Sequence, residues 1–163
     1  GWIRAQRGHV EPAACALDPA HCPEFQRRRD AFLSRLNEAR RRWRQALAPY
    51  EGQELIGYHN EWPYLMGFLG LTMRQFLEPK PGIPPTPKQV QFLKQYAAER
   101  KIRAIVQSTY FPTRAAESVA KNSTAHVVLL CQAVGEISEC ADYVAMLDYN
   151  VTQLTEALQG SSG

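Results

Sequence analysis

The stretch LIGYHNEWPYLMGFLGLTMRQFL, residues 55–77, gives the first view of how this chain is built. Residues 55–58 form a short apolar run typical of a buried strand, residues 61–70 fit a helix, and residues 72–77 indicate a second strand. A strand, a helix and a strand in this order form a β-α-β unit. The two strands of such a unit lie parallel in one sheet.

The same alternation continues toward the C-terminus. We expect a helix from residue 86 or 87 to about 100, a strand at 103–106, a helix at 113–121, a strand at 126–130 and a helix over 141–158. The fold class is therefore α/β, a four-stranded parallel sheet with helices on both faces and right-handed crossovers.

A proline-rich segment interrupts this alternation. The string EPKPGIPPTP, residues 78–87, holds five prolines. Proline donates no backbone hydrogen bond, so this segment does not lie inside the sheet. We expect a stiff loop at the rim of the sheet that ends as a helix N-terminus at Thr86-Pro87.

One long amphipathic helix is expected before the α/β part. Between Cys22 and Ala48, apolar residues recur at spacings of three, four or seven: Phe25, Phe32, Leu36, Ala39, Trp43 and Leu47. Residues 1–22 show no sustained period and contain Pro12 and Pro19, so we expect an irregular leading segment there. The predicted organisation is residues 1–50 for the leading segment and helix, and residues 51–163 for an α/β domain.

The positive charge belongs to this long helix. The chain has a net charge of +3, and residues 1–50 hold 10 basic and 5 acidic side chains. Eight arginines lie on the helix: Arg27, Arg28, Arg29, Arg35, Arg40, Arg41, Arg42 and Arg44. They indicate either nucleic-acid binding or a solvated helix face. We favour the solvated face and predict no nucleic-acid partner, because no aromatic stacking platform or base-reading motif accompanies the charge.

Length and composition exclude several protein classes. A chain of 163 residues with 45% hydrophobic side chains has room for one core. No apolar run approaches the roughly 20 residues of a membrane-spanning helix, so we expect neither a membrane span nor a signal peptide in this sequence. Collagen, a disordered tail and a small disulfide scaffold are also excluded. Nucleophile-elbow, phosphate-loop, dinucleotide-binding and zinc-protease motifs are missing, so we predict that the chain is not an enzyme.

The four cysteines form two pairs that are close in sequence, Cys15 with Cys22 and Cys131 with Cys140. Neither pair has the spacing of a zinc ribbon or a C-x-x-C redox motif. Each pair is compatible with a local disulfide in an oxidising compartment and with two buried thiols in a reducing one. Spacing alone leaves this choice open.

Candidate site residues follow from the predicted sheet, because ligands of open parallel sheets bind beyond the carboxyl ends of the strands. The residues just past the four strands are His59, Asn60 and Glu61; Glu78; Gln107, Ser108 and Thr109; and Cys131 and Gln132. His59 is the strongest candidate for a metal ligand or an acid/base group, against a structural histidine as the alternative. A Cys131/His59 nucleophile pair is disfavoured, because nothing supplies an orienting partner or an oxyanion site.

Three strings carry a resemblance: YHNEWPYLMGFLGL at 58–71, LEPKPGIPPTPKQV at 77–90 and ADYVAMLDYNVTQLTEAL at 141–158. They resemble the C-terminal lobe of the zinc/manganese receptors of bacterial ABC importers. The segment LDPAHCPEF at 17–25, which runs into the long helix, resembles the end of the N-terminal lobe and the interlobe helix of that family. The resemblance implies that the chain is half of a bilobed solute-binding protein that encloses a divalent metal.

The resemblance also implies a ligand set. The family takes two histidines from its N-terminal lobe, a third ligand after the first strand of the C-terminal lobe, and a carboxylate after its last strand. His59 matches the third position, and its imidazole suits Zn²⁺ better than Mn²⁺. The last position falls near Cys131, which is either a soft metal ligand or tied to Cys140. Glu61, Glu78, Gln107 and Gln132 are expected to line the ligand or support it, although Gln107 equally suits capping the next helix or facing water.

Partners and location follow from the same resemblance. It implies an ABC permease as partner, a missing N-terminal lobe, and a periplasmic or other extracytoplasmic location. The alternative is a divergent or truncated receptor lobe without metal that acts as a protein-interaction or adhesin-like module, because the expected carboxylate is missing.

Overall fold

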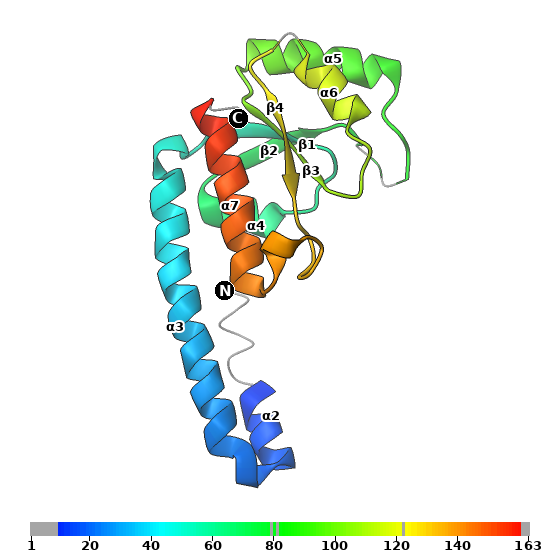
Figure 1. The fold of residues 1–163 in the computed structure, drawn as a ribbon. Helices are drawn as coiled ribbons and strands as arrows, with labels where there is room; N and C mark the ends of the chain where they lie inside the picture. The colour runs from blue at the N-terminus through cyan, green and yellow to red at the C-terminus, as the bar shows by residue number, and fades with distance from the viewer. Residues whose placement is uncertain (1–9, 79, 81, 122, 161–163) are drawn as a thin grey trace. The chain divides into compact units, whose positions relative to one another are not determined.

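The computed structural model describes residues 10–78, 80, 82–121 and 123–160. The helices are α2 (Val10–Leu17), α3 (Cys22–Leu47), α4 (Pro63–Leu69), α5 (Pro87–Glu99), α6 (Arg114–Ala120) and α7 (Tyr143–Gln159) (Figure 1). The strands are β1 (Glu54–Gly57), β2 (Thr72–Phe76), β3 (Ala104–Ser108) and β4 (His126–Leu130). Short 3-10 turns, η1 (Pro19–His21), η2 (Ala48–Tyr50) and η3 (Ser138–Cys140), complete the described elements.

The four strands form one parallel sheet in the order β2-β1-β3-β4. The pairing of β3 with β4 is regular over all five residues of each strand, from Ala104 opposite His126 to Ser108 opposite Leu130. The β1–β2 pairing shifts register between Leu55 and Ile56. The predicted fold class is confirmed, and β4 has the predicted bounds.

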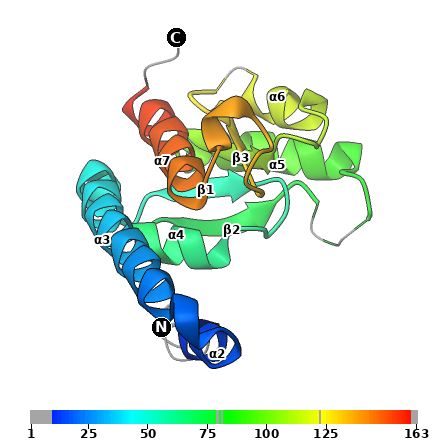
Figure 2. The same ribbon diagram turned by 60° about the horizontal axis from the view of Figure 1, so that its bottom comes forward.

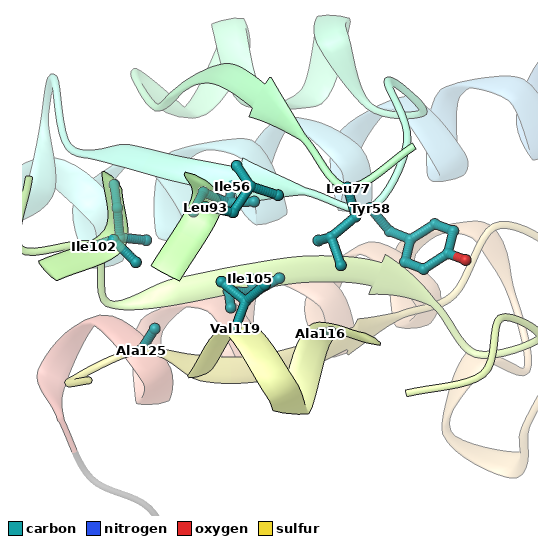
Figure 3. Close-up of a cluster of buried hydrophobic side chains, with 10 residues drawn as sticks. Ile56, Tyr58, Leu77, Leu93, Ile102, Ile105, Ala116, Val119 and Ala125 are labelled. Atoms are coloured by element: carbon teal, nitrogen blue, oxygen red, sulfur yellow. The ribbon is translucent and has the colours of Figure 1, made fainter. Parts of the chain in front are cut away.

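One side of the sheet is covered by α5 and α6. Figure 3 shows Ile56 of β1 and Ile105 of β3 beside Leu93 of α5 and Val119 of α6. These four side chains are fully buried. At the end of the same layer, the ring of Tyr58 stacks on Phe111 with ring centroids 4.4 Å apart.

Strand residues of the other parity fill the opposite side. Leu55, Val106 and Val128 are buried, and they alternate along their strands with residues that face α5 and α6. Helix α7 contacts β4 and β3, and α4 contacts β2. Figures 1 and 2 show α7 across the sheet from the α5–α6 layer, so helices cover both faces as predicted.

The last turns of α3 pack onto this α/β layer. The indole Nε1 of Trp43 donates to Asp148 Oδ1 of α7 at 2.6 Å, and Arg42 donates to the same carboxylate at 3.1 Å. The Trp43 ring meets Phe68 of α4 edge-on, and the Arg44 guanidinium lies 4.6 Å from the centre of the Phe68 ring. The chain forms two compact units, residues 1–41 and residues 42–163, while the predicted organisation into residues 1–50 and 51–163 stays a prediction.

The first unit corrects one expectation. Residues 10–17, predicted to be irregular, form α2, while residues 1–9 lie outside the described residues. Pro12 is tolerated because it lies in the first turn, where the backbone N–H groups have no partner within the helix. No residue of α2 is buried, which explains why no apolar period marks it. A disulfide between Cys15 and Cys22 joins α2 to α3.

Five arginines of α3 pair with acidic groups or lie on an aromatic ring: Arg27, Arg28, Arg29, Arg42 and Arg44. Arg27 and Arg28 hydrogen-bond Glu24 one turn earlier, and the two cations, Arg28 most strongly, lower the pKa of the Glu24 carboxyl. Arg29 bonds Glu11 of α2 at 2.7 Å. Exposed pairs of this kind fit the solvated helix face that we favoured, and the absence of a nucleic-acid partner stays a prediction.

In the part of the chain that the structure describes, no helix is both long and apolar enough to cross a bilayer.

Candidate functional site

All four strands end at one edge of the sheet, which we call the carboxyl edge. The loops that follow the strands carry His59 and Glu61, Glu78, Tyr110, and Gln132. The structure joins these residues into two groups. One contains His59 and Glu78, and the other contains Glu61, Tyr110 and Gln132.

His59 lies directly after β1 and is partly exposed. Its side chain is 27% exposed, and ring atom Nδ1 lies 3.4 Å from the carbonyl oxygen of Glu78. The Glu78 carboxylate Oε2 lies 3.8 Å from the same nitrogen. Neither the hydrogen bonds nor the ion pairs of the described residues involve the other ring nitrogen, Nε2. Among the described residues, His59 therefore has one engaged nitrogen and one nitrogen without a bond.

Glu61 joins the loop after β1 to the end of β3 and the loop that follows it. Its Oε2 accepts a hydrogen bond from the hydroxyl of Ser108 at 2.7 Å, and its Oε1 accepts one from the hydroxyl of Tyr110 at 2.8 Å. The Tyr110 hydroxyl also lies 3.1 Å from Gln132 Oε1. Both oxygens of the Glu61 carboxylate are therefore already bonded to protein groups.

Glu136 is a third carboxylate at this edge, after Glu61 and Glu78, and it was not predicted from the sequence. Its Oε2 accepts from the backbone N–H of Gln132 at 2.7 Å and of Ala133 at 3.1 Å, and its Oε1 accepts from the hydroxyl of Thr109. The predicted site residues are limited to those directly after each strand. The signal available in the sequence was a single carboxylate in the turn that follows the last strand.

The structure corrects the expectation for Cys131. Its sulfur forms a disulfide with Cys140, and the residue is 1% exposed. A disulfide sulfur carries no thiolate charge, so it is neither a metal ligand nor a nucleophile. The sequence left open whether Cys131 is a soft metal ligand or is bonded to Cys140, and the structure shows the bond to Cys140. The same bond removes the Cys131/His59 enzyme hypothesis.

Asn150 of α7 fixes the backbone of Cys131. Its side-chain oxygen accepts from the Cys131 N–H at 2.8 Å, and its side-chain nitrogen donates to the Cys131 carbonyl at 2.9 Å. Asn150 is 1% exposed, so both bonds are shielded from water. The loop after β4 is thus held by a disulfide, by a buried amide and by Glu136.

Gln107 does not join either group of site residues. It is fully buried, so it does not face water, and its side-chain nitrogen donates to the carbonyl of Phe111 at 2.9 Å. It shares the parity of Ile105, which faces α5 and α6, whereas Ser108 bonds Glu61. Its side-chain oxygen has no hydrogen-bond partner among the described residues.

The described residues contain no complete metal site at the carboxyl edge. One group of three candidate ligands lies close together, Glu11 with Cys15 and Cys22, and both of its sulfurs are in a disulfide. At the carboxyl edge, Glu61 and Glu136 are bonded to protein donors, while His59 has a free ring nitrogen. This α/β unit therefore presents a single unengaged nitrogen donor in the position that the resemblance assigned to a ligand.

A family model described as the zinc-uptake complex component A, periplasmic (ZnuA) matches residues 4–157. The chain belongs to this family. The family provides substrate-binding components of ABC importers and is not an enzyme family. No curated protein matches the chain.

Three solved structures share the fold. The periplasmic zinc binding protein TroA from Treponema pallidum is 20% identical, with a TM-score of 0.72 over 91% of this chain and 57% of that one. FpvC from Pseudomonas aeruginosa, in complex with Mn²⁺, is 22% identical, with a TM-score of 0.69 over 93% and 57%. The laminin-binding protein Lbp of Streptococcus pyogenes is 19% identical, with a TM-score of 0.69 over 91% and 57%.

The chain spans a little more than half the length of these three structures. This share agrees with the resemblance of the chain to one lobe and its helix. At these identities, the likeness shows the fold.

Proposed function

We propose that this chain is the C-terminal lobe and interlobe helix of a receptor that binds a divalent metal for an ABC importer. In this proposal His59 is the ligand that the lobe contributes, and the other ligands come from an N-terminal lobe. Family membership supports the receptor role. The free Nε2 of a partly exposed histidine at the carboxyl edge is the observation that carries the role of His59.

Zn²⁺ is the proposed cargo, and Mn²⁺ is the alternative. An imidazole nitrogen is a common ligand of Zn²⁺, whereas Mn²⁺ prefers oxygen ligands. The two carboxylates that would favour Mn²⁺, Glu61 and Glu136, are bonded to hydroxyl and amide donors. Among the related folds, TroA is described as a zinc binding protein, while FpvC was solved with Mn²⁺.

A periplasmic or other extracytoplasmic location and an ABC permease partner belong to the same proposal. The family description names a periplasmic component. Two disulfides, Cys15–Cys22 and Cys131–Cys140, support an oxidising compartment, because such bonds rarely persist in the cytosol.

Metal binding by the purified chain tests the proposal. Direct titration with Zn²⁺ and with Mn²⁺, suited to the weak binding expected of a lobe that supplies one ligand, is compared between the wild type and the His59→Ala variant. We expect His59→Ala to weaken Zn²⁺ binding about tenfold or more, since loss of a group that merely supports a ligand already costs about 10–100-fold. Equal Zn²⁺ affinity in the two proteins would overturn the role of His59.

His126→Ala is the matched control. His126 begins β4 at the opposite edge of the sheet, so its removal is expected to leave Zn²⁺ affinity unchanged. An equal loss of affinity in both variants would point to nonspecific binding by histidines rather than to a site at the carboxyl edge.

A lobe without metal that acts in protein interaction or adhesion is the second candidate. The engaged carboxylates and the disulfide at Cys131 favour it, because the described residues at the carboxyl edge leave fewer donors than the roughly four that Zn²⁺ needs. The related fold of Lbp is described as a laminin-binding protein. Binding of laminin by a chain that takes up neither Zn²⁺ nor Mn²⁺ would favour this candidate over the first.

A further inference from the structure

The backbone on both sides of His59 is fixed by hydrogen bonds. Tyr58 donates its N–H to the Val106 carbonyl at 2.7 Å and accepts from the Glu78 N–H at 2.8 Å. The His59 carbonyl accepts from the N–H of Glu61 at 3.0 Å. With its backbone held from the strands on both sides, His59 keeps its imidazole close to Glu78.

Both groups that face the engaged nitrogen of His59 are hydrogen-bond acceptors. The Glu78 carbonyl oxygen lies 3.4 Å from Nδ1, and the Glu78 carboxylate Oε2 lies 3.8 Å from it. A hydrogen on Nδ1 is attracted by both oxygens, whereas a lone pair there is repelled by both. In a neutral imidazole one nitrogen carries the hydrogen and the other the lone pair, so a hydrogen on Nδ1 leaves the lone pair on Nε2.

The surroundings of Glu78 strengthen this effect. Its side chain is 11% exposed, and its charge acts in a region of reduced dielectric constant. Burial and the negative charge of Glu78 together raise the pKa of the Tyr58 hydroxyl, in that order of importance. Across the described residues, the Glu78 carboxylate makes one charge pair, the one with His59.

We propose that Glu78 is a positioning residue, which holds His59 as the tautomer with hydrogen on Nδ1 and leaves Nε2 as the donor to the metal. The tautomer stands on the geometry alone, and the metal step rests on the proposed function. A carboxylate behind a metal-binding histidine fixes the ring and makes it a better ligand. Glu78 supplies this support twice, through its side chain and through its backbone.

The tautomer is measured directly by NMR on the full chain without metal. Long-range ¹H–¹⁵N correlation spectra distinguish the two neutral tautomers, and His59→Ala assigns the His59 signals among the four histidines. The spectra are recorded at about pH 8.5, where the two neutral tautomers are compared. We expect the pattern of hydrogen on Nδ1. A hydrogen mainly on Nε2, or an equal mixture, would overturn the proposal.

Zn²⁺ titration of Glu78→Ala tests the metal step. We expect affinity to fall about tenfold, with the Nε2–H tautomer gaining population in the NMR spectrum. In Glu78→Gln the backbone carbonyl keeps its hydrogen bond from Nδ1 and the side chain keeps an oxygen near it without the charge, so we expect a smaller loss of affinity and the wild-type tautomer. Glu99→Gln, at the end of α5, is the control and should change neither quantity.

The failures of the two proposals are distinguishable. If His59→Ala loses Zn²⁺ binding while Glu78→Ala keeps the wild-type affinity and tautomer, the role of Glu78 is overturned and the proposed function stands. If His59→Ala binds Zn²⁺ as well as the wild type, the proposed function is overturned together with the metal step. The NMR result on the wild type still decides the tautomer.

Discussion

The loop after β1 and the loop after β4 lie at the same edge of the sheet but differ in how they are held. The first carries His59, whose Nε2 has no bond among the described residues. In the second, the Cys131–Cys140 disulfide, the Asn150 amide and the Glu136 carboxylate are all bonded within the protein. The comparison shows that two loops at one edge of a sheet can have different roles. The loop after β1 keeps a nitrogen donor without a bond, whereas the loop after β4 uses its polar groups to fix its own backbone.

The loop after β4 is also where the resemblance expects a metal-binding carboxylate that this chain lacks. The resemblance places a metal-binding carboxylate near position 131, where this chain has a buried disulfide. Loss of this carboxylate leaves fewer ligands and weakens metal binding. The bonds that fix the loop lower the conformational entropy that is lost when the carboxyl edge becomes ordered. The account therefore predicts large effects on stability in the loop after β4 and a large effect on metal binding at His59.

Removal of the disulfide is expected to have the largest effect on stability. The double variant Cys131→Ala/Cys140→Ala should lower the free energy of unfolding by about 2–5 kcal/mol, the usual cost of losing a native disulfide. Urea unfolding followed by circular dichroism measures it. Cys15→Ala/Cys22→Ala, in the first unit, is the control and should leave the unfolding of residues 42–163 unchanged. An equal loss of unfolding free energy in both double variants would show that the Cys131–Cys140 disulfide does not specifically hold the loop after β4.

Asn150→Ala should have the next largest effect. It leaves the buried N–H and carbonyl of Cys131 without partners, which costs about 2–3 kcal/mol. The measurement is again urea unfolding, with the exposed Thr152→Ala on the same helix as the control. A cost below that of the control would show that water replaces the amide and that the loop is not fixed from α7.

Glu136→Gln should destabilise the lobe by about 1 kcal/mol, because hydrogen bonds to a charged carboxylate become bonds to a neutral amide. The thermal unfolding midpoint, compared with that of Glu139→Gln, measures this difference. Glu139 is exposed and bonds only its neighbour Ser138 among side chains of the described residues. Equal midpoints in the two variants would show that Glu136 does not support the loop.

His59→Ala should have the smallest effect on stability. The side chain is 27% exposed and makes one long hydrogen bond, so we expect a change of about 0.5 kcal/mol or less. Urea unfolding of the metal-free chain measures it. A loss as large as that of Asn150→Ala would mean that His59 is a structural histidine, the alternative that the sequence left open.

Much of the fold could be predicted from local patterns. Strand β4 has the predicted bounds, and α3 begins at the predicted Cys22. Both could be predicted because a buried strand shows as a run of apolar residues and a helix with one buried face shows as a helical period. Helix α2 was not predicted, because none of its residues is buried and no apolar period marks it. Pro12 also indicated an irregular segment, although proline is tolerated in the first turn of a helix. Trp43 near the end of α3 bonds Asp148 of α7 across 105 residues, a contact that no local pattern encodes.

The site was less predictable than the fold. His59 and Glu78 were placed at one edge because both directly follow predicted strands, and the structure puts them in contact. Glu136 lies six residues beyond β4, too far along the chain to be predicted at the carboxyl edge. The turn after β4 brings its carboxylate back to the N–H of Gln132, and the sequence does not show this turn. The pairing of Cys131 with Cys140 was left open, because spacing is compatible with both a disulfide and free thiols.

A Zn²⁺ titration of the wild type, His59→Ala and Glu136→Gln under one set of conditions tests the central claim most directly. The account predicts that His59→Ala loses about tenfold or more in affinity, while Glu136→Gln binds Zn²⁺ like the wild type. A loss of affinity in Glu136→Gln, with wild-type binding in His59→Ala, would contradict it and would move the metal ligand from the loop after β1 to the loop after β4.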